Sequence, residues 1–131
     1  MKREYPRKIY AIKHNVTGRV YIGSTGKPIQ DRYCAHIRLL RRGKHSSKLM
    51  QKDFIEYGED YTVFELGTIP SEEEREKEYE YMLKYNTGDR RYGYNQYDVE
   101  HRAKKKSIKM NFSTDNSELV RKNGLADYEG N

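Results

Sequence analysis

With 131 residues the chain has the length of a single domain, and its core must be modest because 34% of its residues are apolar and 35% are charged. No apolar run reaches the roughly 20 residues that span a bilayer, and no signal-peptide core follows the basic start of the chain. The single cysteine, Cys34, excludes an internal disulfide and a zinc cluster, so we expect a cytoplasmic or otherwise intracellular protein that does not bind membranes.

The net charge of +6 is unevenly distributed. Residues 1–44 hold twelve Lys or Arg residues against two acids, whereas residues 71–80 hold six glutamates. A basic half of this kind is compatible with a polyanionic partner such as nucleic acid, and equally with an ordinary solvated surface. Charge alone does not decide between the two.

The first 58 residues predict a β-hairpin followed by two helices. Strands are expected over 8–14 and 19–24, because apolar and aromatic residues flank a turn rich in Asn and Gly. Pro28 favours a helix start, and Ile29, Tyr33, Ile37 and Leu40 recur at helical spacing until Gly43. A second helix is expected after Ser46, ending at about Tyr57 before Gly58.

The second half predicts one more strand and one more helix. Residues 61–66 alternate as a strand, and a helix is expected from a Ser71 cap, with Glu74 three residues on, to about Tyr85. The order β-β-α-α-β-α predicts an α+β fold, a small three-stranded antiparallel sheet flanked by helices. We divide the chain into a domain over 1–98 and a basic, polar and partly disordered tail over 99–131.

Two helical positions are unusual for their surroundings. Glu78 falls on the same helical face as Tyr81, Met82 and Tyr85, where a buried carboxylate needs a cation; a structural ion pair and a metal both meet this need. Arg32 and His36 share a face of the first helix by their spacing of four, beside its apolar residues. A core histidine and a catalytic one are both compatible with that position.

The hairpin carries a resemblance to a known family. The segments Lys8-Ile9-Tyr10 and Tyr21-Ile22-Gly23 resemble the paired signature of the GIY-YIG nuclease superfamily, with Lys8 where glycine is usual. Further elements follow in the family's order over residues 8–96, namely Arg32, His36, His45, Glu78 and Gly93-Tyr94-Asn95. The resemblance implies a GIY-YIG endonuclease-like fold and a phosphodiester hydrolase acting on DNA.

The resemblance also implies roles for the residues. Glu78 would hold one Mg²⁺ (or Mn²⁺) ion per site, and Arg32 would bind the scissile phosphate. Tyr10 would be the general base, assisted by His36 or metal-bound water, and Tyr21 would orient water or phosphate; the two tyrosine roles could be exchanged. Asn95 would position the turn or the metal shell.

Several basic residues are expected to contact DNA from the surface. His45 and Lys13 are assigned surface roles, together with the basic pairs Arg41, Arg42, Lys104 and Lys105.

One site per chain predicts nicking of one strand at a time. Duplex, single-stranded and branched DNA all remain open as substrates, and the oligomeric state is undecided. The alternatives are a catalytically inactive nucleic-acid-binding module of the same fold, and a structural domain whose tyrosines only fill the core.

Overall fold

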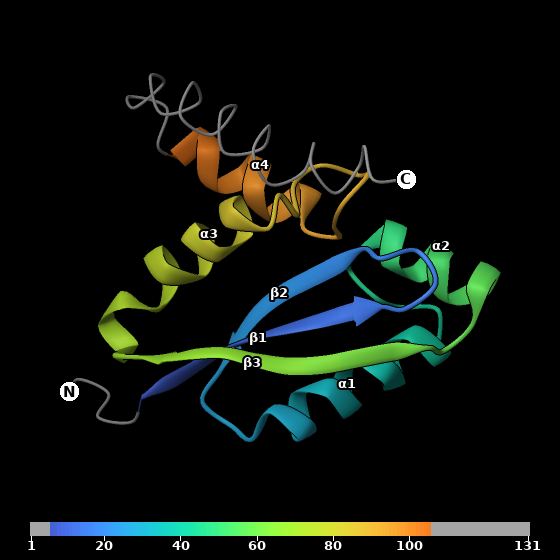
Figure 1. Ribbon diagram of the computed structural model, residues 1–131, viewed down its shortest axis with the longest axis horizontal. Helices are drawn as coiled ribbons and strands as arrows, with labels where there is room; N and C mark the ends of the chain where they lie inside the picture. Colours follow the sequence, from blue (N-terminus) through green and yellow to red (C-terminus); the bar gives the residue numbers. More distant parts are fainter. Residues whose placement is uncertain (1–5, 106–131) are drawn as a thin grey trace.

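The computed structural model describes residues 6–105 and confirms the predicted α+β fold. Three antiparallel strands form one sheet in the order β2-β1-β3, with helices around it (Figure 1). In chain order the elements are β1 (Arg7–His14), β2 (Val20–Thr25), α1 (Ile29–Arg41), α2 (Lys48–Tyr57), β3 (Tyr61–Ile69), a 3-10 helix η1 (Ser71–Glu73), α3 (Glu74–Lys84) and α4 (Gln96–Lys105).

Strand β1 is the centre of the sheet and is covered on both faces. Its residues Ile9–Ile12 are all buried, because alternate side chains point into two separate cores. Tyr10 and Ile12 pack into the core formed with α1 and α2, whereas Ile9 and Ala11 pack into the core that contains Met82 of α3. The central strand therefore presents Tyr10 to the helices α1 and α2.

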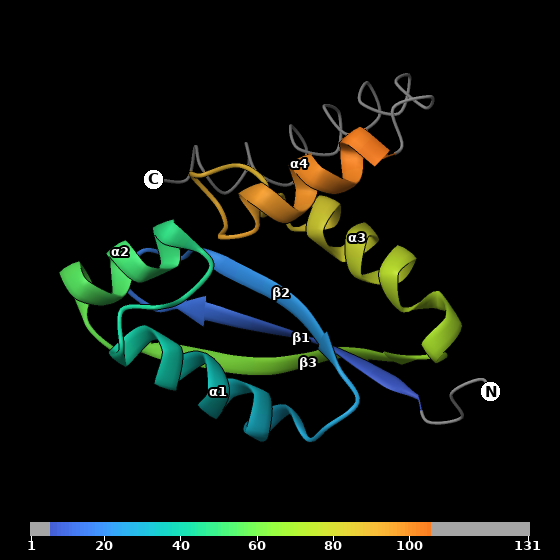
Figure 2. The ribbon, with the colours of Figure 1, turned by 180° about the vertical axis from the view of Figure 1, so that it is seen from behind.

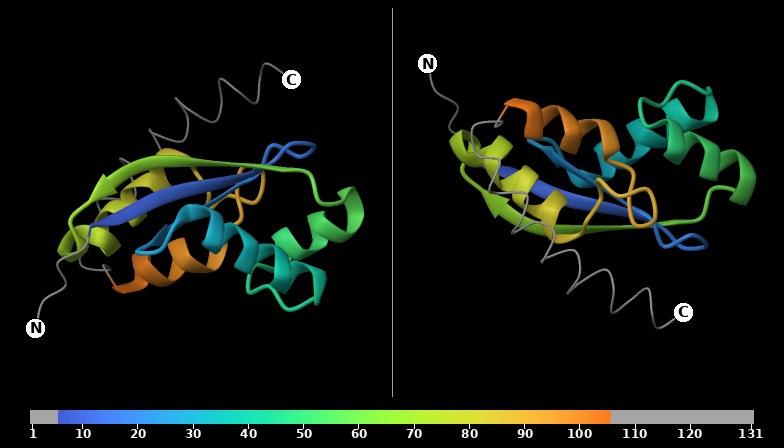
Figure 3. Two further views of the ribbon diagram at one scale, coloured as in Figure 1. Left: turned by 90° about the horizontal axis from the view of Figure 1, so that it is seen from below. Right: turned by 90° about the horizontal axis from the view of Figure 1, so that it is seen from above.

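The helices lie in two groups around the sheet. Helices α1 and α2 cover one face, as the rear view and the views from below and above show (Figures 2 and 3). Helix α3 packs on β2 and on α4, beside the edge of the sheet (Figure 1). Strand β2 therefore lies between the two groups, and side chains from both can reach the space around it.

Two details of the third helix differ from prediction. Ser71 lies within η1 and not before the first helical turn, because Pro70 occupies the N-cap position and its carbonyl accepts the Glu73 N–H at 3.0 Å. Tyr85 follows the last residue of α3 and is 36% exposed, while Tyr79, off the predicted stripe, is 3% exposed. Contact with α4 as well as β2 widens the buried face of α3.

Helix α4 was not predicted. It spans Gln96–Lys105 and so continues across the expected domain boundary at residue 98, with Arg102 joined to Glu78 of α3. The remainder of the predicted tail, residues 106–131, lies outside the described residues. In the part of the chain that is described, no helix combines the length and the apolar character needed to cross a bilayer.

Candidate active site

Tyr10 lies at the centre of the site, and its ring accounts for the glycine at position 23 in the second motif. It is 1% exposed, and its Cα pairs with that of Gly23 in β2. A Cβ on Gly23 would lie 2.5 Å from Tyr10 Oη, so the glycine leaves the space that the phenol ring fills. Lys8, which stands where the first motif usually has glycine, is exposed and leaves Tyr10 in place.

A row of hydrogen bonds joins the Tyr10 hydroxyl to two buried histidines. We call the three residues Tyr10, His36 and His45 the Tyr10 chain. Tyr10 Oη lies 2.8 Å from His36 Nε2, and His36 Nδ1 lies 2.8 Å from His45 Nε2. The predicted surface role of His45 is wrong, because its side chain is 5% exposed. The turn between α1 and α2 directs it inward, where its Nδ1 accepts the Ser47 N–H at 3.0 Å.

The Ser47 amide sets the direction of these hydrogen bonds. A backbone N–H only donates, so His45 Nδ1 is the acceptor and a neutral His45 carries its proton on Nε2. That proton is donated to His36 Nδ1, which leaves the proton of a neutral His36 on Nε2. His36 therefore donates to the Tyr10 oxygen, and the hydroxyl proton of Tyr10 points elsewhere.

Both histidines are neutral near neutral pH. Burial lowers the pKa of His36 to about 3, and the charges of His45 and Arg32 act in the same direction. Burial also lowers the pKa of His45, again assisted by Arg32. A buried imidazolium beside a guanidinium is costly, so the neutral forms that give the Tyr10 chain its direction are the stable ones.

Tyr10 and Tyr21 differ in their electrostatic surroundings, although their ring centroids are only 6.4 Å apart. Burial raises the pKa of Tyr10 on balance, although the charge of Arg32 in α1 opposes this rise. Burial raises the pKa of Tyr21 strongly, the charges of Tyr10, Asp98 and Glu78 raise it further, and Arg32 is only the weakest influence. His36 is therefore the donor at hydrogen-bond distance from the Tyr10 oxygen, and the pKa of both tyrosines is raised, with Arg32 opposing the rise more strongly at Tyr10.

Glu78, in α3, acts electrostatically on the two tyrosines. Its side chain is 13% exposed, and its charge raises the pKa of both Tyr10 and Tyr21. Its Oε1 accepts a hydrogen bond from Arg102 Nη2 at 2.9 Å. Burial raises the pKa of Glu78, and the hydrogen bond and charge of Arg102 lower it. The structural ion pair that the sequence allowed is thus formed. The charge of Glu78 nevertheless still acts on Tyr10 and Tyr21.

Glu78 also fits the requirements of a magnesium ligand. The ion pair with Arg102 uses Oε1, and Oε2 accepts no hydrogen bond from residues 6–105. Magnesium commonly takes one or two carboxylates and completes its shell with water and substrate phosphate. Within these residues no three His, Cys, Asp or Glu side chains converge as a ready metal cage, which agrees with a single carboxylate supported by Arg102.

Asn95 lies inside the fold, next to the strand that carries Tyr21. It is 1% exposed, its Oδ1 accepts the Ile22 N–H at 2.8 Å, and its Nδ2 donates to the Ile22 carbonyl at 3.1 Å. The same amide donates to Asp98 Oδ2 at 3.0 Å. Asn95 thus joins β2 to the first turn of α4, and this contact fits a positioning role.

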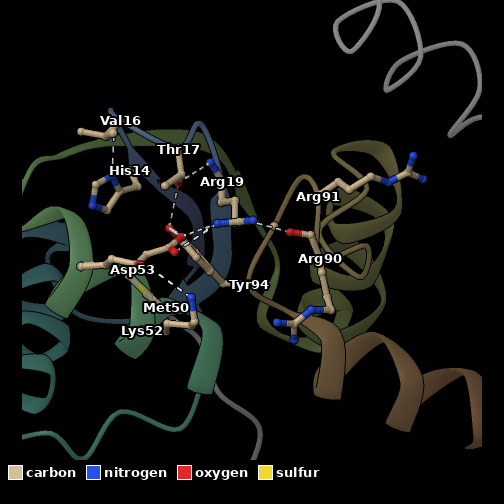
Figure 4. Close-up of polar contacts among 12 residues, drawn as sticks. His14, Val16, Thr17, Arg19, Met50, Lys52, Asp53, Arg90, Arg91 and Tyr94 are labelled. Atoms are coloured by element: carbon tan, nitrogen blue, oxygen red, sulfur yellow. Dashed lines mark hydrogen bonds and ion pairs between the residues drawn. The ribbon is translucent and has the colours of Figure 1, made fainter. Parts of the chain in front are cut away.

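A second buried polar group, which we call the Asp53 cluster, consists of Arg19, Asp53 and Tyr94 (Figure 4). Asp53 in α2 is 1% exposed, and Arg19 Nη1 donates to its two oxygens at 2.8 and 3.1 Å. Tyr94 Oη donates to Asp53 Oδ2 at 2.7 Å. This cluster was not predicted from the sequence, although Asp53 lies three residues after Met50 on the buried side of α2, which is the same kind of signal that indicated Glu78.

The six residues predicted to contact DNA from the surface lie on several elements. Five of these residues are exposed, and the buried His45 is the exception described above. Arg41, at the end of α1, forms an exposed ion pair with Glu59 at 2.8 Å. The exposed residues are Lys13, Arg41, Arg42, Lys104 and Lys105. Their contact with DNA stays a prediction.

Comparisons with known proteins agree with this geometry. Residues 7–98 match the GIY-YIG catalytic domain family. The "catalytic domain of intron endonuclease I-TevI", solved as a glutamate-to-alanine mutant, matches with a TM-score of 0.62 and 29% identity over 69% of this chain and 92% of that one. A second structure of the catalytic domain of "Homing Endonuclease I-TevI" gives 0.60 and 28%, over 66% and 96%.

A curated relative extends the comparison beyond structures. "Intron-associated endonuclease 1" of Enterobacteria phage T4 is 35% identical over 66 residues, which is 50% of this chain and 26% of the relative. The fold and the site together therefore define a GIY-YIG domain. The family match covers most of the chain, so the chain belongs to the GIY-YIG catalytic domain family, a family of nucleases.

Proposed function

We propose that the protein is a metal-dependent endonuclease that hydrolyses phosphodiester bonds in DNA and nicks one strand per active site. The arrangement of Tyr10 carries this proposal, because a general base must be able to lose its proton, and a donor hydrogen bond from His36 and the positive charge of Arg32 both favour the phenolate. The endonuclease names of the relatives support the same reading.

Each site residue then has a separate task. Tyr10, as the phenolate stabilised by His36 and Arg32, takes a proton from water as the water oxygen forms its bond to phosphorus and the bond to the leaving ester oxygen breaks. Tyr21 keeps its proton and orients the water or the phosphate, while Arg32 offsets phosphate charge. One Mg²⁺ or Mn²⁺ ion, held by Glu78, would supply positive charge to the phosphate and to the leaving oxygen.

His45 and Asn95 act through other residues in this scheme. His45 keeps the His36 proton facing Tyr10, and Asn95 keeps β2, with Tyr21, in register with the start of α4. Both are positioning residues, because neither has a polar atom free to touch the phosphate. Arg102 likewise holds Glu78 by one oxygen and leaves the other for the cation.

Plasmid cleavage tests the proposal and its metal. Supercoiled DNA incubated with the protein and Mg²⁺ or Mn²⁺ should first give nicked circles, and a chelator should stop the reaction. Glu78→Ala should abolish cleavage and leave DNA binding intact or tighter, since it removes a negative charge. Glu80→Ala, which removes an exposed glutamate of the same helix, is the matched control.

Three outcomes would contradict the scheme in different ways. Full cleavage by Glu78→Ala would remove Glu78 as metal ligand, and cleavage in chelator would remove the metal. Salt-sensitive DNA binding without cleavage in either metal would identify an inactive binding module instead.

A further inference from the structure

A groove of about 290 Å³ opens beside Tyr21. One wall is the start of α2, with Lys48 and Leu49, and the other is the start of α4, with Tyr97. Figures 1 and 2 show the segment before α4 approaching the start of α2. Ser47 Oγ donates to the Tyr94 carbonyl at 2.9 Å and ties the two walls together. Because Tyr21 lines it, the groove continues directly from the active site.

Tyr97 offers a flat aromatic surface at this groove. It lies in the first turn of α4 and is 72% exposed, so it contributes little to the core. Its ring lies nearly parallel to that of His101, with 15° between the planes and 5.5 Å between the centroids. Aromatic side chains presented in this way are the surfaces on which proteins stack unpaired nucleic-acid bases.

The charges around the groove are divided between its sides. Lys48 and Arg90 line it, and neither forms an ion pair within residues 6–105. Figure 4 shows the Arg90 side chain turned away from the Asp53 cluster. Asp98 and Glu100 of α4 also line the groove. Phosphates are attracted to the side with Lys48 and Arg90 and repelled by the carboxylates of α4, next to which an uncharged base is tolerated.

We propose that this groove binds the nucleobase next to the scissile phosphate, stacked on Tyr97, with the adjoining phosphate held by Lys48 and Arg90. The inference rests on the proposed function, since it places the cleaved strand at Tyr21. Ligand pockets start at roughly 300 Å³, so the space suits one nucleotide rather than a duplex. The bound base must leave its own stack, so an unpaired flanking base binds best.

A double-mutant cycle between protein and DNA tests this contact. Binding is measured in Glu78→Ala protein, so that no cleavage intervenes, on an oligonucleotide in which each nucleotide is replaced in turn by an abasic residue. One abasic position beside the cleavage site should weaken binding by about fivefold to a hundredfold, the range of base–aromatic stacking. Adding Tyr97→Ala should weaken binding to intact DNA similarly and abolish the effect of that abasic position.

Two further variants make the test specific to the aromatic ring. Tyr97→Phe keeps the ring and should bind like the parent, whereas Tyr57→Ala removes an exposed tyrosine outside the groove and should change nothing. Unchanged binding of Tyr97→Ala, or the same abasic effect with and without Tyr97, overturns the inference. The binding assay requires no DNA cleavage, so its result does not depend on activity. Failure of the wild-type protein to cleave DNA would therefore overturn the proposed function and not this inference about binding.

Discussion

The Tyr10 chain and the Asp53 cluster are both buried polar groups next to the core that contains α1 and α2, yet they differ in how completely they are satisfied. The Asp53 carboxylate accepts hydrogen bonds from Arg19 and Tyr94, and its charge is balanced by the guanidinium. The Tyr10 chain starts at a backbone amide and ends at a hydroxyl whose proton is directed away from His36. A closed cluster of this kind stabilises the fold, whereas an open one can exchange a proton.

The largest expected effect is on catalysis, in Tyr10→Phe. The change removes the proposed base, so the rate of DNA cleavage should fall by about a hundredfold to ten thousandfold, the usual contribution of general acid–base catalysis. Stability should fall only slightly, because the ring stays and one neutral hydrogen bond is lost. Single-turnover cleavage and urea unfolding measure the two effects. Normal cleavage would assign the base to another group.

Asp53→Ala should give the opposite result. It leaves Arg19 without its counter-charge and Tyr94 without its acceptor, and should cost about 3 kcal/mol of unfolding free energy, as for other buried pairs broken on one side. Cleavage per folded molecule should change little. Glu59→Ala breaks the exposed pair with Arg41 and is the control that should hardly affect unfolding. Equal stability of Asp53→Ala and the parent would show that the cluster does not hold α2 in place.

Acid pH should sharpen the difference between the two groups. His36 and His45 have folded-state pKa values below the unfolded value of about 6.5, so below that pH the unfolded chain binds more protons than the folded one. Stability should therefore fall as the pH drops below about 6.5, by up to about 1.4 kcal/mol per pH unit for one histidine, and the contribution of His36 should continue toward pH 3. Unfolding measured across this range should show a shallower slope for His45→Gln.

The matched control for the pH experiment is His101→Gln, which removes an exposed histidine of α4. Its slope should equal that of the parent. If His45→Gln also keeps the full slope, His45 does not contribute to the acid sensitivity.

Local patterns along the chain predicted most of the elements. The hairpin, the first two helices and the third strand follow from apolar spacing and turn residues, which depend on neighbours a few positions away. Glu78 stood out because it falls on an apolar helical face, and His36 because it shares a helical face with Arg32 beside the apolar residues. The same signal was present at Asp53, but its partners Arg19 and Tyr94 lie 34 and 41 residues away, so no local pattern pairs them.

The family and the sheet could be read from the sequence, which also predicted most of the residues now found around Tyr10, because motif order and hydrophobic period are properties of the chain read in one dimension. Only the tertiary structure decided that His45 is buried, that Arg102 of an unpredicted helix meets Glu78, and that the proton of His36 faces Tyr10. Each of these depends on which donors and acceptors meet once distant segments pack together. Hydrogen-bond direction and desolvation exist only in that packed arrangement, where a single backbone amide at Ser47 orients three side chains.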